Sequence, residues 1–90
     1  MTLEALVAKY IRNTGQVFAE IKIAQNKPTL IDKGKVNEVL EIAKHYFADA
    51  KYYQGKNKFE TSLVSIVYCE GLLDALKLLG AVEFLWPPKK

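Results

Sequence analysis

The chain has 90 residues and a net charge of +3; half of its residues are hydrophobic and 26% are charged. This size and balance predict one small folded domain and exclude a disordered chain. Lysine supplies nearly all of the positive charge, with Arg12 as the sole arginine. Arginine usually makes the bidentate contacts to phosphates and base edges, so this composition weighs against specific nucleic-acid recognition.

The single cysteine and the hydrophobic pattern indicate where the protein resides. Cys69 stands alone, which excludes an internal disulfide and a cysteine metal cluster and fits a reducing cytoplasm. No hydrophobic run approaches the ~20 residues of a membrane span. The N-terminus carries Glu4 and no early basic cluster, unlike a signal peptide. We therefore expect a cytoplasmic protein without membrane contact.

The first predicted helix runs from about Thr2 to Gln25. Its hydrophobic residues recur three or four positions apart, and at about 100° per residue they form one core-facing stripe. Thr2 is suited to cap the helix N-terminus. Gly15 weakens the helix by about 1 kcal/mol relative to alanine. The stripe stays in phase across this glycine, so we predict one helix with a bend allowed there, ending before Pro28.

Two further helices are predicted over residues 35–54 and 59–79. Gly55 and the short turn after it place them antiparallel, and Gly80 closes the second. Most of the circumference of this last helix is hydrophobic. The predicted fold is all-α: an up-down-up three-helix bundle over residues 1–80 with a tight C-terminal helical hairpin. A tail, residues 81–90, is hydrophobic as far as Trp86 and ends in prolines and lysines.

The hairpin carries a pattern that resembles a known family. The pattern is Tyr46-x-x-Asp49-Ala50-Lys51-Tyr52-Tyr53, Gly55, Thr61, Ser65-Ile66-x-Tyr68-x-Glu70-Gly71-Leu72-Leu73-Asp74-Ala75 and Leu79-Gly80. It resembles the small archaeal domain-of-unknown-function family numbered 357. The resemblance implies a short three-helix bundle from the archaeal cytoplasm, without an established activity, whose members are sometimes joined to nucleotidyltransferase-like domains. Cys69 departs from the alanine expected at its position, and the hydrophobic tail lies outside the resemblance.

A carboxylate and tyrosine face is the candidate ligand site. Glu70 and Asp74 are four residues apart on one helix, and Asp49 lies on the helix that packs against it. Such carboxylates can bind a divalent metal, but di-iron bundles also use a Glu-x-x-His pair, which is absent here. The favoured alternative is a solvent-exposed strip in which Asp74 pairs with Lys77. A further alternative buries Glu70, with hydrogen bonds from Tyr46 or Tyr53.

Tyr52 adds a weak nucleic-acid signal to this face. Lysines beside an exposed aromatic ring can contact a phosphate backbone while the ring stacks on a base. Acidic residues on the same face, Glu38, Glu41 and Asp49, make the local charge mixed. We therefore expect no nucleic-acid binding.

No residue is predicted to be catalytic, and no metal or cofactor site is predicted. His45 is expected on the solvent side of its helix without a nucleophile, and Cys69 is expected to be a buried, inert thiol. Gly71 is expected to allow close approach of a neighbouring helix or aromatic ring. The Arg-x4-6-His pair of small helical ribonucleases is missing around Arg12 and His45, which removes a ribonuclease function.

The predicted function is a non-catalytic interaction module. Its hydrophobic surface is expected to form a homodimer or to dock another protein, through Leu72, Leu76, Leu79, Phe84, Leu85 and Trp86. Alternatively, the tail folds back and covers its own helix. A different function remains open: an accessory bundle for a nucleotidyltransferase-type enzyme, binding a nucleotide, nucleic acid or divalent metal at Asp49, Tyr52, Glu70 and Asp74.

Overall fold

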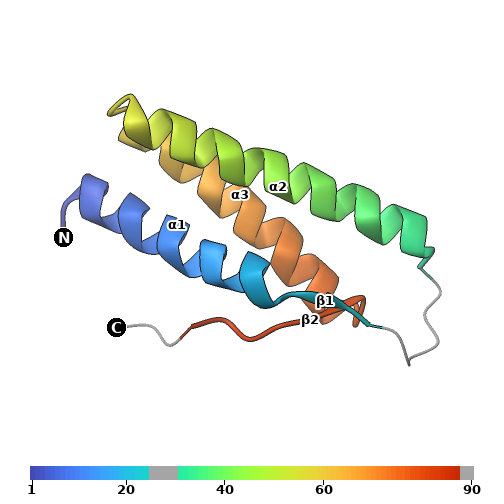
Figure 1. Cartoon of the computed structure of the whole chain (residues 1–90). Helices are drawn as coiled ribbons and strands as arrows, with labels where there is room; N and C mark the ends of the chain where they lie inside the picture. The colour runs from blue at the N-terminus through green and yellow to red at the C-terminus, as the bar shows by residue number, and fades with distance from the viewer. Residues whose placement is uncertain (25–30, 88–90) are drawn as a thin grey trace.

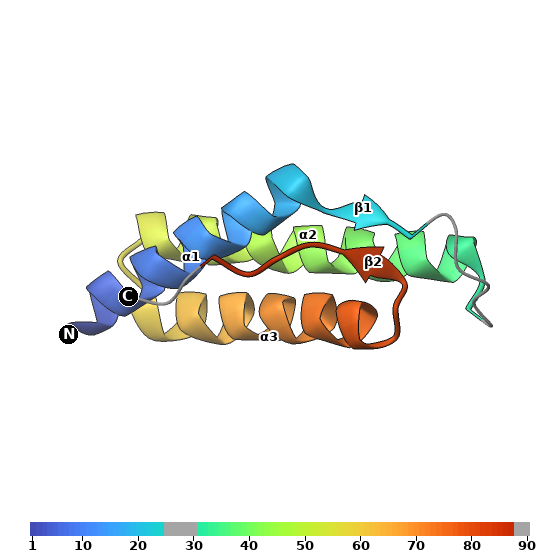
Figure 2. The same ribbon diagram turned by 90° about the horizontal axis from the view of Figure 1, so that it is seen from below.

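The structure is a computed structural model that describes residues 1–24 and 31–87. Its elements in chain order are α1 (Leu3–Glu20), β1 (Lys22–Ile23), α2 (Lys33–Gly55), α3 (Phe59–Leu78) and β2 (Val82–Glu83). The helices run up, down and up, and the chain after α3 returns as an extended segment along α1 and α3 (Figures 1 and 2). The predicted all-α three-helix bundle and its C-terminal hairpin are confirmed.

Local hydrogen bonds explain where the helices begin and end. The Ala5 backbone N–H donates to Thr2 Oγ1 at 3.1 Å, so Thr2 is the N-cap that the sequence predicts. Between α2 and α3, Asn57 adopts a positive φ of 60°, which reverses the chain within a few residues. Gly80, with φ of 75°, ends the last helix as expected.

The first helix is shorter than predicted. It ends at Glu20 instead of continuing to Gln25, and Lys22–Ile23 pairs antiparallel with Val82–Glu83. The Ala24 backbone N–H also donates to the Ala81 carbonyl oxygen at 3.0 Å. This tertiary pairing overrides the helical periodicity, which carries no information about a strand partner almost 60 positions away. Residue 25 and the connector at 26–30 lie outside the described residues.

One hydrophobic core holds the helices together. Its buried residues come from all three helices: Val7, Ile11, Val17, Val36, Leu40, Ala43, Ala50, Ile66, Cys69, Leu73 and Leu76. At Gly15 the Phe47 ring lies 3.4 Å from the position that a Cβ atom would occupy, and Phe47 packs against Phe18 with ring centroids 5.1 Å apart. The glycine therefore admits an aromatic ring of α2 while α1 continues unbroken.

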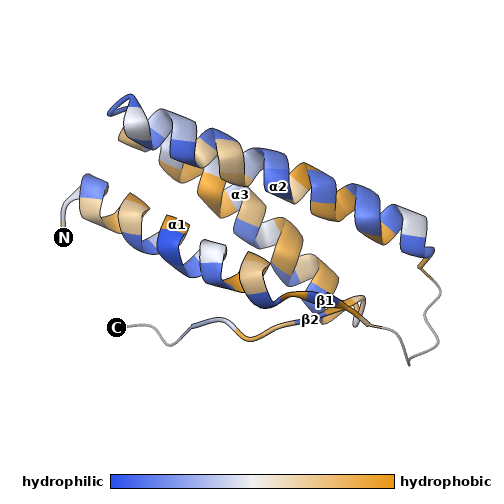
Figure 3. Cartoon of the chain, in the orientation of Figure 1, coloured by the Kyte–Doolittle hydropathy of each residue, from blue (hydrophilic) through white to orange (hydrophobic). Residues whose placement is uncertain are grey.

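The tail is part of this core. Ala81, Val82 and Phe84 are buried with the helical residues. The three-helix domain predicted over residues 1–80 is thus joined in its core by these buried residues of the tail. Hydrophobic residues colour most of α3, whereas α2 alternates between hydrophobic and hydrophilic residues (Figure 3). A helix as hydrophobic as α3 needs cover on several sides, and the tail provides one of them.

Candidate functional site

The predicted interaction residues do not form one exposed patch. Leu76 and Phe84 are buried in the core, and Leu72 and Trp86 are half-buried. Only Leu79 and Leu85 expose most of their side chains to solvent. The prediction is therefore wrong for Leu76 and Phe84 as surface residues, because the tail folds back over its own helix.

A different hydrophobic surface remains exposed, and we call it the outer face of α3. It consists of seven uncharged exposed residues: Val64, Val67, Tyr68, Gly71, Ala75, Leu78 and Leu79. At 100° per residue they occupy an arc of about 120°. In Figure 2 no other described element lies on the side of α3 that is turned away from α1. Most of the circumference of α3 is hydrophobic, and this face is the part that α1, α2 and the tail leave exposed.

Gly71 lies in the middle of the outer face. A Cβ atom added to this glycine would meet nothing within 4 Å, so no described helix or ring of this chain makes the close approach that the glycine was expected to allow. Tyr68 borders the glycine and stacks on Tyr46 of α2 with ring centroids 4.5 Å apart. The backbone at Gly71 is thus accessible from outside, beside an anchored aromatic ring.

The candidate ligand face is divided between two sides of the molecule. Asp49 and Tyr52 are exposed on α2, where the Lys56 ammonium lies 5.5 Å from the Tyr52 ring centroid. Glu70 and Asp74 instead line a pocket with residues of α1 and the tail. Within residues 1–24 and 31–87, no three His, Cys, Asp or Glu side chains are grouped so that they could hold a metal ion. The four residues therefore do not form the single site considered from the sequence.

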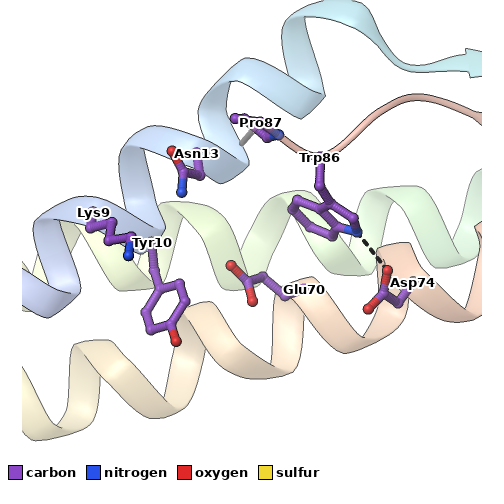
Figure 4. Close-up of a pocket in the computed structure, with 7 residues that line it drawn as sticks. All are labelled: Lys9, Tyr10, Asn13, Glu70, Asp74, Trp86 and Pro87. Carbon is purple, nitrogen blue, oxygen red and sulfur yellow. Dashed lines mark hydrogen bonds between the residues drawn. The ribbon is translucent and has the colours of Figure 1, made fainter. Parts of the chain in front are cut away.

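The pocket lies where α1, α3 and the tail meet. It has a volume of about 180 Å³ and is lined by Lys9, Tyr10, Asn13, Glu70, Asp74, Trp86 and Pro87 (Figure 4). The Trp86 indole Nε1 donates to Asp74 Oδ1 at 2.6 Å. The expected pairing of Asp74 with Lys77 is replaced by this bond, and Lys77 lies over the Phe84 ring at 4.9 Å from its centroid. No local pattern in the sequence indicates that Trp86 reaches Asp74.

Glu70 is half-buried, and its negative charge acts on the thiol of the neighbouring Cys69. The buried Thr14 hydroxyl donates to Glu70 Oε2 at 3.4 Å, in the role expected of Tyr46 or Tyr53. Burial, and secondly the charge of Glu70, raise the pKa of the Cys69 thiol to about 12. A thiol with this pKa is protonated at neutral pH, so the prediction of an inert buried cysteine is confirmed. His45 is exposed on α2, as predicted.

Comparison with known proteins gives a family and no function. None of the helices in the described ranges combines the length and hydrophobicity needed to cross a membrane. No curated protein and no solved structure matches the chain. One family model, described as protein of unknown function (DUF357), matches residues 9–82. This match spans most of the sequence and includes the hairpin pattern, and the chain therefore belongs to the DUF357 family.

Proposed function

We propose that the protein is a non-catalytic homodimerisation module of the cytoplasm whose interface is the outer face of α3. The observation that carries the proposal is the extent of hydrophobic side chain exposed there. Leu78 is 87% exposed, Val64 71% and Val67 49%. Single exposed hydrophobic residues need no explanation, whereas a continuous stripe of them along one helix is typical of an interface.

The exposed area is large enough for a small interface. The large side chains of the face leave on the order of 500 Å² in contact with water, near the upper end for a monomer's largest patch. A standard interface removes about 800 Å² from each partner, so this face is smaller than a standard interface. Two copies paired through this face would remove about 1,000 Å² in total, which is the lower limit for a specific interface.

The chemistry of the face favours a second copy as its partner. An isologous interface sets the same patch against itself, so a charge near its centre would face an identical charge across the axis. Glu60 lies within the same arc at its N-terminal end, but from Val64 to Leu79 the arc contains no charged residue. Gly71, followed by Ala75 one turn later, lets a second helix approach closely at the centre. Tyr68 supplies the aromatic anchor that usually dominates interface energy.

We expect the two α3 helices to cross antiparallel near Gly71. An antiparallel arrangement aligns the helix dipoles favourably and keeps Glu60 of one copy away from Glu60 of the other. Val67 then lies opposite Ala75 of the second copy, and Val64 lies opposite Leu78. This register makes the interface testable residue by residue.

The alternative function as an accessory bundle for a nucleotidyltransferase-type enzyme is not proposed. That function needs Asp49, Tyr52, Glu70 and Asp74 to act at one site. Asp49 and Tyr52 project from α2 into solvent, while Glu70 and Asp74 belong to the pocket beside α1. The homodimer uses surface that the described chain leaves uncovered.

Sedimentation of three proteins tests the proposal. We expect the wild-type chain to sediment as a dimer of the 10.2 kDa subunit. Val67→Lys places a charge in the centre of the face and is expected to give a monomer with an unchanged helical circular dichroism spectrum. Leu85→Lys is the matched control, since Leu85 is 78% exposed but lies on the tail outside the face, and it is expected to remain dimeric. A monomeric wild-type chain, or a dimeric Val67→Lys variant, would contradict the proposal.

A further inference from the structure

The turn between α2 and α3 concentrates the positive charge of the chain. We call residues 51–58 the hairpin tip; their sequence is Lys-Tyr-Tyr-Gln-Gly-Lys-Asn-Lys. The tip contains three lysines and no acidic residue, which equals the net charge of +3 of the whole chain. The rest of the chain balances ten basic residues with ten acidic ones. The hairpin tip is therefore a positively charged segment of an otherwise neutral chain.

The hairpin tip is exposed at one end of the bundle. The turn joins α2 and α3 at the end where the N-terminus also lies (Figures 1 and 2). The three lysines and Tyr52 are exposed, while Tyr53 and Gln54 are half-buried. The nearest acidic residues in the sequence, Asp49 and Glu60, lie on either side of the tip. The lysines are therefore available to a partner from solvent.

The acidic residues of α2 that weaken the nucleic-acid signal in the sequence are paired with other lysines. The Lys35 ammonium lies 3.4 Å from the Glu38 carboxylate. The Lys44 ammonium lies 3.5 Å from the Glu41 carboxylate. At 1.5 Å per residue, Glu41 is about 16 Å from Tyr52 along the helix, and Glu38 is about 21 Å away. Both distances exceed the Debye length of about 8 Å at physiological ionic strength, so these carboxylates do little to cancel the charge of the tip.

Backbone hydrogen bonds hold the hairpin tip in one conformation. The Lys56 N–H donates to the Tyr52 carbonyl oxygen at 3.2 Å, and the Lys58 N–H donates to the Tyr53 carbonyl oxygen at 2.9 Å. A partner therefore meets lysines on an ordered backbone, which lowers the entropy cost of binding. Because these N–H groups bond within the turn, contact with an anion falls to the lysine side chains.

Tyr52 adds an exposed aromatic ring to the lysines. Its side chain is 59% exposed, and its ring lies nearly perpendicular to that of Tyr53, with centroids 5.3 Å apart. The Lys56 ammonium lies 5.5 Å from the Tyr52 ring centroid, and the Lys51 ammonium lies 4.7 Å from that of Phe47. Both lysines contact rings, which leaves their charge available to a phosphate. A nucleotide whose base stacks on Tyr52 would carry its phosphate near Lys56.

We propose that the hairpin tip binds single-stranded nucleic acid without sequence preference. The ammonium groups of Lys51, Lys56 and Lys58 contact phosphates, while Tyr52 stacks on an unpaired base. The tip contains no arginine, which fits a partner whose bases are stacked upon and whose edges are not read. The tip shares no residue with the outer face of α3, so this binding does not depend on the proposed homodimer.

Fluorescence anisotropy of a labelled oligothymidylate of about 12 nucleotides measures the binding to the full chain. We expect a Kd on the order of 100 µM in about 50 mM salt. Neutralising three phosphates of a single strand gives a slope of log affinity against log salt of about −2, so the affinity should fall about twentyfold between about 50 and 200 mM salt. An abasic oligonucleotide of the same length keeps the phosphates and lacks the bases, and it is expected to bind about tenfold more weakly with the same slope.

Variants assign the binding to the hairpin tip. Tyr52→Ala is expected to weaken binding about tenfold without changing the salt slope, whereas Tyr52→Phe keeps the ring and is expected to bind like the wild type. Lys58→Gln removes one phosphate contact and is expected to reduce the slope by about 0.7. Lys33→Gln is the matched control, since it removes an exposed lysine at the opposite end of α2, and it is expected to bind like the wild type.

Any of four results would overturn the proposal. The first is the absence of an anisotropy change in about 50 mM salt. The second is equal affinity for the abasic oligonucleotide, which would indicate a general attraction to anions. The others are unchanged affinity in Tyr52→Ala, and equal effects of Lys33→Gln and Lys58→Gln.

Discussion

Replacing Phe84 by alanine tests whether the tail belongs to the folded core. Phe84 is only 8% exposed, its ring meets Trp86 edge-on at 5.1 Å, and the Lys77 ammonium lies 4.9 Å from its centroid. The substitution removes the ring and leaves a cavity between the tail and α3. Leu85 is the matched control, since it is the next residue, is 78% exposed and is equally hydrophobic.

The expected loss is large for so small a domain. Truncating a buried phenylalanine to alanine lowers the free energy of unfolding by about 3–5 kcal/mol. A chain of this length has a total of about 5–13 kcal/mol. A domain of 60–100 residues loses about 4–8 °C in Tm for each kcal/mol, so Phe84→Ala is expected to melt at least about 12 °C below the wild type. Leu85→Ala is expected to change the free energy of unfolding by no more than about 0.5 kcal/mol.

Urea unfolding followed by far-ultraviolet circular dichroism measures both variants. Each is measured at one protein concentration in a Val67→Lys background, so that any dimer does not contribute to the difference. If Phe84→Ala and Leu85→Ala unfold at the same urea concentration, the tail does not contribute to the core, and the docking of residues 81–86 is refuted.

Three further predictions concern single groups. Ser62→Ala removes a buried hydroxyl that donates to the Ala50 carbonyl oxygen at 2.6 Å, and is expected to lower the free energy of unfolding by about 1 kcal/mol in urea titrations; no change would mean that this bond does not tie α2 to α3. Thr2→Ala removes the acceptor of the Ala5 N–H and is expected to lower the same quantity by about 1 kcal/mol, whereas Thr2→Ser should restore it. The folded-state pKa of Cys69 is raised from 9.0 to about 12, so its contribution to stability is complete below pH 9 and falls as the pH rises toward 12. Urea unfolding between pH 8 and 11 should therefore show a steeper loss for the wild type than for Cys69→Ala, and equal slopes would contradict the assigned pKa.

Local sequence signals predicted the hairpin well. The expected ranges 35–54 and 59–79 lie within two residues of Lys33–Gly55 and Phe59–Leu78. Gly55 and Gly80 mark the ends of these helices, and hydrophobic spacing identifies their buried residues. The terminal glycines and the hydrophobic spacing depend on residues within a few turns of the same helix, so each helix can be predicted from its own segment.

Nonlocal contacts account for the predictions that failed. The end of α1 depends on pairing between Ile23 and Val82, and the fate of the tail depends on which surface accepts Phe84. Periodicity reports that these residues are hydrophobic, but it does not report what covers them. Because Leu76 and Phe84 are buried, the interface proposed above uses other hydrophobic residues of α3.

Parts of the candidate site were likewise predictable only in outline. The sequence places Glu70 and Asp74 on one strip of α3, and the structure keeps them together. The sequence does not indicate that Thr14 and Trp86 donate hydrogen bonds to Glu70 and Asp74, since Thr14 and Trp86 lie on other segments of the chain. Gly71 was expected to allow close approach of a neighbouring helix or ring, and the sequence does not indicate that no described helix of this chain lies there.

The measurement that tests the proposed dimer most directly is isotope-filtered NMR on a mixture of labelled and unlabelled chains. We expect intermolecular NOEs between the methyl groups of Val67 and Ala75, and between those of Val64 and Leu78. Within one chain these pairs are about 12 Å and 21 Å apart along the helix, too far for an NOE, so such signals can only arise between copies. A mixture that gives no intermolecular NOE to any residue of the outer face of α3 would contradict the proposed function.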